Sequence, residues 1–261
     1  MVDSDSAAAV RAGTPSRFSG TLMDVLDSVS YARVDPGVID DPIYKLRYRA
    51  YTREGFMDHN PEEICIDDLD DVPNGMSFGV YIKSELVSSI RLHLLTAEHR
   101  RSPSMKVFPD ILGPMLDQGM TFIDPSRFTA DHDASLAYPT MPFLTLRIAA
   151  MASVYFGVSQ CLAIVRPEHG AFYRRVFGSE LIAEERSYPG LYFPVALYGA
   201  SVDSIRSRVA QRFPFFLSTA EERQHLFAGS KPQGAELRVR ASARHAFESA
   251  RIALEGGAPA Q

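Results

Sequence analysis

The sequence has no tryptophan and only two cysteines, Cys65 and Cys161, which lie far apart along the chain. Two isolated cysteines do not make a metal-binding framework, so we expect no metal site, and their scarcity suggests a reducing compartment. No run of about 18 apolar residues is present, which argues against a transmembrane helix. The first residues, MVDSDSAAAVRAG, lack the apolar core of a secretory signal. Together these absences predict a cytoplasmic protein.

The balance of charge and hydrophobicity is that of a folded, mildly acidic chain. Of its 261 residues, 46% are hydrophobic and 23% are charged, which is enough apolar material for a sizeable core. This length suits one large domain, or one domain with appendages. The net charge of -5 disfavours a nucleic-acid-binding protein, because such proteins need a basic face.

Helical and alternating patterns predict a mixed α/β sheet. Residues 41–56 begin with an Asp-Pro pair, which is a common helix start. Residues 76–96 alternate as a β-hairpin. Residues 141–156 are apolar on almost all sides and predict a helix buried against a sheet, and residues 160–165 predict a short central strand. A proline-started helix and one or two further strands follow.

Three segments are predicted along the chain. Residues 1–30 are a flexible lead with one short helix, and residues 31–200 carry the sheet. Within that domain, residues 129–140 are a polar loop. Residues 201–261 have a helical pattern and are expected to form a C-terminal helical extension.

The stretch FIDPSRFTAD, residues 122–131, contains the main candidates for catalytic residues. It places an acid, Asp124, three residues before a cation, Arg127. Pro125 has no N–H to donate, so the strand is at an edge, bulged or splayed there. A strand that splays in mid-sheet opens a slot for a ligand. The alternative is that Asp124 and Arg127 form a structural ion pair.

Three further groups of side chains are candidates. Arg47 and Tyr51 lie four residues apart and share a helix face, where Arg47 either meets an anion or extends to solvent. In the hairpin, Arg91 and His93 put polar groups on a face that we expect to line a cleft, although His93 is also consistent with a plain surface residue. An acidic loop either binds a cation or an amine, or forms a solvated turn. Its acids are Asp67, Asp68, Asp70 and Asp71.

The order of elements over about residues 35–200 is similar to that of the GCN5-related acetyltransferases. This resemblance implies a GNAT-like mixed central sheet flanked by helices. The ordered motifs resemble two relatives of that fold, the acyl-homoserine-lactone synthases and the N-acyl amino acid synthases first known from environmental DNA. The autoinducer-synthase motifs are matched by Arg47, Tyr51 and Phe56; by Asp67 and Asp70, or Asp68 and Asp71; by Arg91, Leu92 and Thr96; and by Asp124, Ser126, Arg127 and Phe128. The stretch PEHGAFYRRVFG resembles a helix of the N-acyl amino acid synthases at His169, Phe172, Tyr173, Phe177 and Gly178.

Three departures separate this chain from the autoinducer synthases. Asp124 stands where their pattern has glutamate, so the acid has a shorter reach. Cys65 or Ile66 stands where a glutamate precedes their D-x-x-D motif, and their tryptophan is absent. These departures favour the N-acyl amino acid synthases.

A missing glycine-rich loop bears on the acyl donor. Acetyl-CoA users of this fold hold the pyrophosphate with backbone N–H groups of a glycine-rich loop at a helix N-terminus. The equivalent stretch here is TADHDASLAYPTMP, which contains no glycine. An acyl-carrier protein presents a phosphopantetheine arm with one phosphodiester and no pyrophosphate. We therefore expect a carrier-protein thioester as the donor and no further cofactor.

The resemblance implies that a long-chain fatty acyl group moves from a carrier protein to the amine of an amino acid. Asp124 is expected to take the amine proton, directly or through water. Arg91, Arg127 or Arg47 is expected to bind the acceptor carboxylate, and backbone N–H groups of the splayed strand to stabilise the oxyanion. The tail is expected between helix 141–156 and the sheet. The implied substrate-binding residues are Arg47, Tyr51, Asp67, Asp70, Ser126, Phe128, Phe143, His169 and Tyr173.

The expected partners are an acyl-carrier protein and a small amine, with possible peripheral contact with the lipid product. A basic loop is expected either to dock the acidic carrier or to be solvated. Its members are His99, Arg100, Arg101 and Lys106. Three alternatives stay open: an autoinducer synthase, a non-catalytic acyl-binding or sensing module, and an acyltransferase for proteins or polyamines. The acceptor and the acyl length are not fixed by the sequence.

Overall fold

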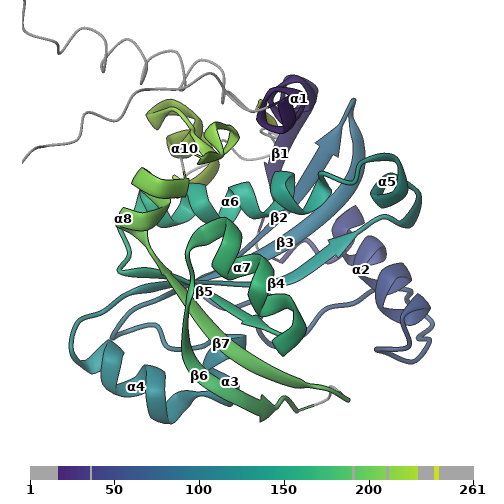
Figure 1. Ribbon diagram of the computed structural model, residues 1–261. Helices are drawn as coiled ribbons and strands as arrows, with labels where there is room; N and C mark the ends of the chain where they lie inside the picture. Colours follow the sequence, from purple (N-terminus) through teal and green to yellow (C-terminus); the bar gives the residue numbers. More distant parts are fainter. Residues whose placement is uncertain (1–16, 36, 190–191, 210–211, 229–237, 241–261) are drawn as a thin grey trace, which may run out of the picture.

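A mixed β-sheet forms the centre of the computed structural model, with helices on both faces (Figure 1). Its strands are β1 (Val29–Arg33), β2 (Gly75–Ile82), β3 (Glu85–Leu95), β4 (Phe122–Ala130), β5 (Gln160–Val165), β6 (Glu180–Ser187), β7 (Pro194–Ser201) and β8 (Arg238–Arg240). The structure describes residues 17–35, 37–189, 192–209, 212–228 and 238–240. Within those ranges the strand order is β6-β7-β5-β4-β3-β2-β1-β8. Neighbouring strands are antiparallel except β4 and β5, which run parallel.

The helices form two layers around this sheet. They are α1 (Arg17–Leu26), α2 (Pro42–Arg53), α3 (Pro103–Val107), α4 (Pro109–Asp117), α5 (His132–Ala137), α6 (Met141–Phe156), α7 (Gly170–Phe177), α8 (Val202–Ser204) and α10 (Ala220–Phe227). One hydrophobic cluster joins α1, α6, α7 and α10 to one face of the sheet, and a second joins α3 and α4 to the other. In the described ranges, no helix is long and apolar enough to cross a membrane.

Local sequence signals set the ends of several elements. The Asp41 side chain caps α2 by accepting a hydrogen bond from the Ile43 N–H at 3.0 Å. Gly157 ends α6 in the left-handed conformation with φ of 61°, which glycine adopts without steric cost. The β2–β3 turn is made by Lys83 and Ser84, both with positive φ, as the type I′ form of a two-residue hairpin turn requires. The predicted hairpin and the predicted helices at 41–56 and 141–156 are therefore confirmed.

The strand β4 splays away from β5 as its proline suggested. It pairs with β3 over most of its length, but with β5 only at Phe122 and Ile123. Beyond those residues the edges of β4 and β5 that face each other have no strand between them. A bulge follows, and Arg127 adopts a φ of 50° within it. The sheet is thus split in its middle.

Two parts of the fold differ from the sequence-based expectation. The Ala- and Arg-rich segment after residue 234 was expected to be helical, but Arg238–Arg240 is a strand because it pairs with the open edge of β1. The remainder of that segment lies outside the described residues, as does the lead up to residue 16. The expected polar loop contains α5. Helix α1 lies in the lead, where one short helix was expected, and both α1 and α10 pack in the main hydrophobic core.

A buried ion pair ties the C-terminal helix to the core. Arg147 of α6 donates to Glu222 of α10 at 2.5 Å and 3.0 Å, and also to the carbonyl oxygens of Phe215 and Leu217. The side chains of Arg147 and Glu222 are 0% and 2% exposed. Charges so deeply buried are tolerated only when they are paired, so this contact holds α10 against α6.

We expect the Glu222→Gln substitution to destabilise the fold by about 3–5 kcal/mol, because it leaves the Arg147 guanidinium buried beside a neutral partner. Urea unfolding gives this free energy. Glu54→Gln is the matched control, since Glu54 pairs with Arg53 at the surface and its removal changes stability by less than about 1 kcal/mol. Equal stability losses for the two variants would contradict the assigned role of the buried pair.

Candidate active site

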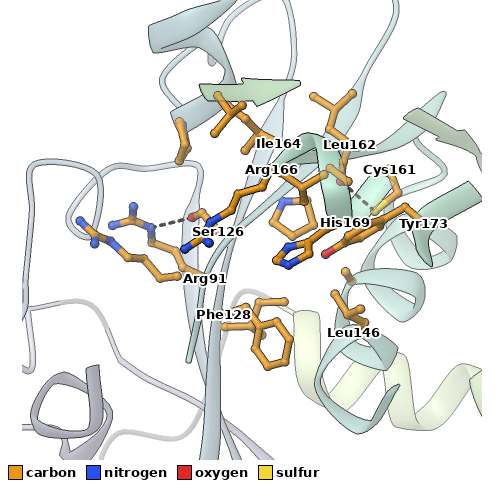
Figure 2. Close-up of a pocket in the computed structure, with 18 of the residues that line it drawn as sticks. Arg91, Ser126, Phe128, Leu146, Cys161, Leu162, Ile164, Arg166, His169 and Tyr173 are labelled. Atoms are coloured by element: carbon orange, nitrogen blue, oxygen red, sulfur yellow. Dashed lines mark hydrogen bonds between the residues drawn. The ribbon is translucent and has the colours of Figure 1, made fainter. Parts of the chain in front are cut away.

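A cavity of about 620 Å³ lies where β4 leaves β5 (Figure 2). It passes through the split in the sheet, so residues from both faces line it. Ser126, Phe128 and Arg91 form one wall, and Leu162 and Ile164 of β5 form the opposite wall. Behind the sheet, the cavity reaches α6 and α7, where its lining is Leu146, Ala149, Ala150, Tyr173 and Phe177.

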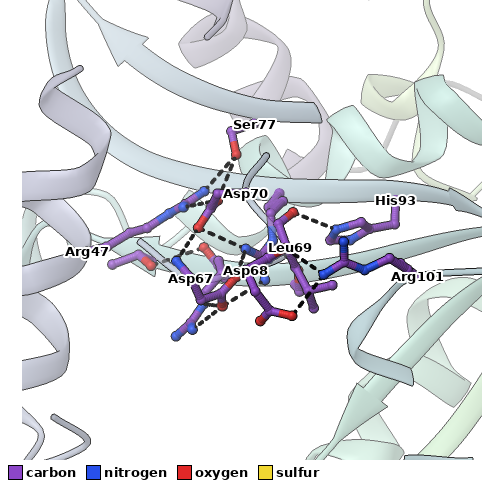
Figure 3. Close-up of polar contacts among 12 residues, drawn as sticks. Arg47, Asp67, Asp68, Leu69, Asp70, Ser77, His93 and Arg101 are labelled. Carbon is purple, nitrogen blue, oxygen red and sulfur yellow. Dashed lines mark hydrogen bonds and ion pairs between the residues drawn. The ribbon is translucent and has the colours of Figure 1, made fainter. Parts of the chain in front are cut away.

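Five charged side chains alternate in a chain beside the cavity, and we call them the arginine–aspartate chain. Figure 3 labels three of its members, Arg47, Asp67 and Asp70. Arg47 donates to Asp70 at 2.7 Å, and Arg91 lies 2.9 Å from the other oxygen of Asp70. Arg91 also donates to Asp67 at 2.6 Å. Arg127 completes the chain through hydrogen bonds from Nε and Nη2 to Asp67. The chain joins α2, the acidic loop, β3 and β4.

The three arginines of the arginine–aspartate chain determine the charge state of its two aspartates. Burial alone raises the pKa of the Asp67 carboxyl, but hydrogen bonds and charge from Arg91 and Arg127 outweigh it and lower the pKa below its ordinary value of 3.8. Burial likewise opposes the charged form of Asp70, and Arg47 and Arg91 again lower the pKa. Both aspartates are therefore ionised at neutral pH. Three cations against two anions leave one excess positive charge, which faces the cavity at the partly exposed Arg127.

Some residues of the arginine–aspartate chain make contacts other than those that the sequence led us to expect. Arg47 was expected to bind substrate, but its side chain is 0% exposed and donates to Asp70 and Ser77, so it does not line the cavity. The acidic loop was expected to bind a cation or an amine, or to be a solvated turn, and its Asp67 and Asp70 bind arginines of the protein itself. Arg91 and Arg127 do line the cavity, and so does Tyr51, whose ring centroid is 5.1 Å from the Arg127 guanidinium carbon.

Asp124 points away from the cavity and does not pair with Arg127. Its carboxylate is 0% exposed and accepts hydrogen bonds from the backbone N–H and the hydroxyl of Ser104, at 2.9 Å and 2.8 Å. This contact fixes the first turn of α3 against β4. His93, opposite Asp124 in the ladder, is also buried, with Nε2 3.0 Å from the Leu69 carbonyl oxygen. Proton transfer by Asp124 remains a prediction.

The apolar part of the cavity uses a different face of α6 from the one expected. Phe143 was expected to line an acyl tunnel, but it packs in an aromatic cluster away from the cavity. Its partners there are Phe18, Phe172, Phe213 and Phe215. Helical spacing puts Leu146, Ala149 and Ala150 on the face that does meet the cavity.

The remaining predicted residues lie at the cavity. Ser126 accepts a hydrogen bond from Arg91 Nε at 3.2 Å, and Phe128 is 39% exposed at its edge. The rings of His169 and Tyr173 point into the cavity (Figure 2). Burial raises the pKa of the Tyr173 hydroxyl to about 12 and that of the Cys161 thiol to about 12, so both stay protonated at neutral pH. A cysteine thiolate nucleophile at Cys161 is therefore disfavoured.

Sequence reasoning missed one charged residue of the cavity, Arg166. It follows the last residue of β5 and precedes Pro167, so the signal was a cation at the carboxyl end of a central strand. Its guanidinium carbon lies 4.0 Å from the ring centroid of Phe193. No group of three or more His, Cys, Asp or Glu side chains among the described residues is placed to hold a metal.

The split parallel pair, the buried helix behind it and the cavity that joins both faces define a GNAT-like fold. A comparison with protein families is more specific, because the family described as N-acyl amino acid synthase FeeM matches residues 42–201. The chain belongs to this N-acyl amino acid synthase family.

Solved structures agree on the fold. FeeM, an N-acyl amino acid synthase from uncultured soil microbes, is similar with a TM-score of 0.55 and 15% identity, over 70% of this chain and 96% of that chain. The AHL synthase LasI is similar with a TM-score of 0.50 and 14% identity, over 79% of this chain and 98% of its own. TofI is similar with a TM-score of 0.50 and 17% identity, over 69% and 98%. No curated protein matches the chain.

The arginine–aspartate chain makes stability depend on pH. The pKa of Asp67 is lowered in the folded protein, so its contribution is present above the ordinary carboxyl pKa of 3.8 and is lost as pH falls through the lowered value. We expect Asp67→Asn to be less stable than the wild type at neutral pH. The difference should shrink as pH falls below 3.8.

Urea unfolding at a series of pH values measures this difference. Asp117→Asn is the control, because Asp117 pairs with Arg100 at the surface and its side chain is 63% exposed. A stability difference between wild type and Asp67→Asn that stays constant across this pH range would show that the Asp67 charge is not responsible.

Proposed function

We propose that the protein transfers a long-chain fatty acyl group from an acyl-carrier protein to the amine of an amino acid. The observation that carries this proposal is the single cavity through the split sheet, which is apolar on the α6 side and cationic on the other. An N-acyl amino acid has the same division, with an apolar tail and an anionic head. Family membership supports the reaction type.

The tail fits the part of the cavity beneath α6. Leu146, Ala149 and Ala150 present only hydrocarbon there, and two of these three side chains are small. Burying an alkyl chain against such a surface is favourable by about 0.8 kcal/mol for each CH₂ group. A volume of about 620 Å³ falls within the range of sites that enclose elongated small molecules.

The head of the acceptor fits the cationic part. The amine must approach the thioester carbonyl in the slot between β4 and β5, where the facing backbone groups of β4 beyond Ile123 have no strand partner. Such N–H groups are suited to an oxyanion. Arg91 and Arg127 supply the positive field that favours an acceptor with a carboxylate.

Two side chains are candidates for accepting the amine proton. Asp124 is the acid that the sequence motif indicates, but both of its oxygens accept hydrogen bonds from Ser104. His169 lies at the cavity and is exposed to it. An imidazole nitrogen that faces the cavity can accept a proton, so we assign the transfer to His169, directly or through a water molecule.

The donor assignment rests on the start of α6. Pro142 has no N–H, and the N–H groups of Met141 and Phe143 donate to Tyr138 and Thr140 at 2.9 Å and 3.0 Å. The Leu144 N–H is also directed at Thr140, at 3.4 Å. A pyrophosphate cradle needs such groups free, so the local bonding favours a phosphopantetheine arm over coenzyme A.

Three of the basic side chains that were expected to dock the carrier are already paired with aspartates of the protein. Arg101 and Lys106 both pair with Asp68, and Arg100 pairs with Asp117. These pairs are exposed and therefore weak, so an acidic carrier can compete for the cations. We propose that docking exchanges these internal pairs for contacts with the carrier.

The test of the function is incubation of the protein with fatty acyl-carrier protein and a mixture of the standard amino acids. Mass spectrometry should find an N-acyl amino acid, and the same acyl group on coenzyme A should react more slowly. A new acyl-homoserine lactone when S-adenosylmethionine is supplied would indicate an autoinducer synthase. Tight acyl binding without any turnover would indicate a sensing module.

Two variants separate the proton-transfer candidates. His169→Gln should lower kcat by about 100-fold or more, as expected for loss of a general base, with little change in melting temperature. Asp124→Asn should keep more activity but lose stability, because it disturbs the acceptor of the Ser104 hydrogen bonds. The opposite pattern, with turnover lost only in Asp124→Asn and stability unchanged, would assign the proton to Asp124.

A further inference from the structure

Arg166 differs from the other arginines of the cavity in how its hydrogen-bond donors are used. Arg91 donates through Nε to Ser126 and through both terminal nitrogens to Asp67. Arg127 donates to Asp67 through Nε and Nη2. In the described part of the chain, the Arg166 guanidinium makes no hydrogen bond. Its Nη1 forms an ion pair with Glu168 at 3.7 Å, which is weak because the two side chains are 36% and 61% exposed.

Two aromatic rings hold Arg166 in place without occupying its donors. Its guanidinium carbon lies 4.0 Å from the ring centroid of Phe193 and 5.7 Å from that of Phe56, and these rings are 5.7 Å apart. A guanidinium that stacks through its face keeps its N–H edge available. Phe56 follows α2, whereas Phe193 precedes β7. The stack therefore orders the long side chain before a ligand binds, which lowers the entropy lost on binding.

Arg166 lies on the side of the cavity where the carboxylate of the proposed substrate is expected. It follows the last residue of β5 and lines the cavity (Figure 2), while Arg127 lies on β4. The two cations therefore come from the two strands that flank the split. The apolar lining at Leu146 and Ala149 lies behind the sheet. A tail placed there leaves the anionic end of the substrate on the side of Phe56 and Arg166.

We propose that Arg166 is the substrate-binding residue that recognises the carboxylate of the amino acid acceptor. This deepens the proposed function and rests on it. A planar guanidinium matches a carboxylate with two parallel N–H donors, and the stacked edge of Arg166 is free to make them. Arg91 and Arg127, which the sequence favoured for this task, hold Asp67 and shape the slot instead.

Binding of two probes tests the proposal without turnover. N-dodecanoylphenylalanine carries the carboxylate, and N-dodecanoylphenethylamine is the same molecule without it. By calorimetry, Arg166→Gln should bind N-dodecanoylphenylalanine at least about tenfold more weakly than the wild type does. Its affinity for N-dodecanoylphenethylamine, the probe without a carboxylate, should be the same as that of the wild type. The affinity of Arg166→Lys for N-dodecanoylphenylalanine should lie between those of the wild type and Arg166→Gln, because lysine keeps the positive charge but lacks the two parallel N–H donors of a guanidinium. Arg174→Gln is the matched control, since Arg174 stacks on Tyr198 outside the cavity.

Two results of the binding experiment would overturn the proposal. One is a wild-type protein that binds the two probes with equal affinity. The other is an Arg166→Gln variant that still prefers the probe with the carboxylate. In kinetics, Arg166→Gln should raise KM for phenylalanine or another accepted amino acid and leave KM for the acyl donor unchanged. A rise only in the donor KM would place Arg166 at the phosphodiester of the carrier arm and reject the carboxylate assignment. Selective binding without any acyl transfer would instead contradict the proposed function and leave the anion site standing.

Discussion

The Asp67 carboxylate is the contact on which the geometry of the cavity depends. It receives hydrogen bonds from Arg91 of β3 and from Arg127 in the bulge of β4. Asp70, three residues later, ties Arg91 to Arg47 of α2. Because these charges are largely removed from water, each is stable only while its partners stay in place. The acidic loop, α2 and the two strands are therefore fixed as one unit around the slot.

The second constraint is the split between β4 and β5. A parallel pair that continued its ladder would close the middle of the sheet and leave no passage between its faces. Pro125 lacks an N–H, and the bulge gives Arg127 a positive φ, so β4 turns away after Ile123. The split brings an apolar chamber and a cationic chamber into one cavity. That arrangement suits the proposed reaction, in which a fatty acyl chain is joined to the amine of an acceptor that carries a carboxylate.

The burial of ionisable groups around the slot also restricts the chemistry. Cys161 and Tyr173 face the cavity, but burial keeps both protonated at neutral pH. Direct attack of the acceptor amine on the thioester is then simpler than a covalent acyl-enzyme. In the reaction that we propose, the protein contributes by excluding water, by holding the acceptor and by taking one proton, which are the contributions of positioning and general-base catalysis.

Local signals in the sequence predicted much of the fold. The Asp41-Pro42 start of α2, the alternation of the hairpin and the glycine stop after α6 are determined by neighbours within a few residues. The strand Arg238–Arg240 was missed because its conformation depends on the open edge of β1, about 200 residues away in sequence.

The site was predicted less completely than the fold, for the same reason. Spacing placed Asp124 and Arg127 near each other, but the bulge that contains Arg127 lets this side chain donate to Asp67, while Asp124 accepts from Ser104. Apolar composition identified α6 but not which of its faces meets the cavity. Arg166 belongs to no motif, and its surroundings come from Phe56 and Phe193, which only the folded chain brings together.

The most direct test of this account is a crystal structure of the protein with an N-acyl amino acid bound. The account predicts that the acyl chain lies beneath α6 along Leu146 and Ala149, that the amide lies in the slot beside Ser126, and that the carboxylate faces the arginine side of the sheet. An acyl chain on the arginine side, or a ligand bound outside the split between β4 and β5, would contradict it.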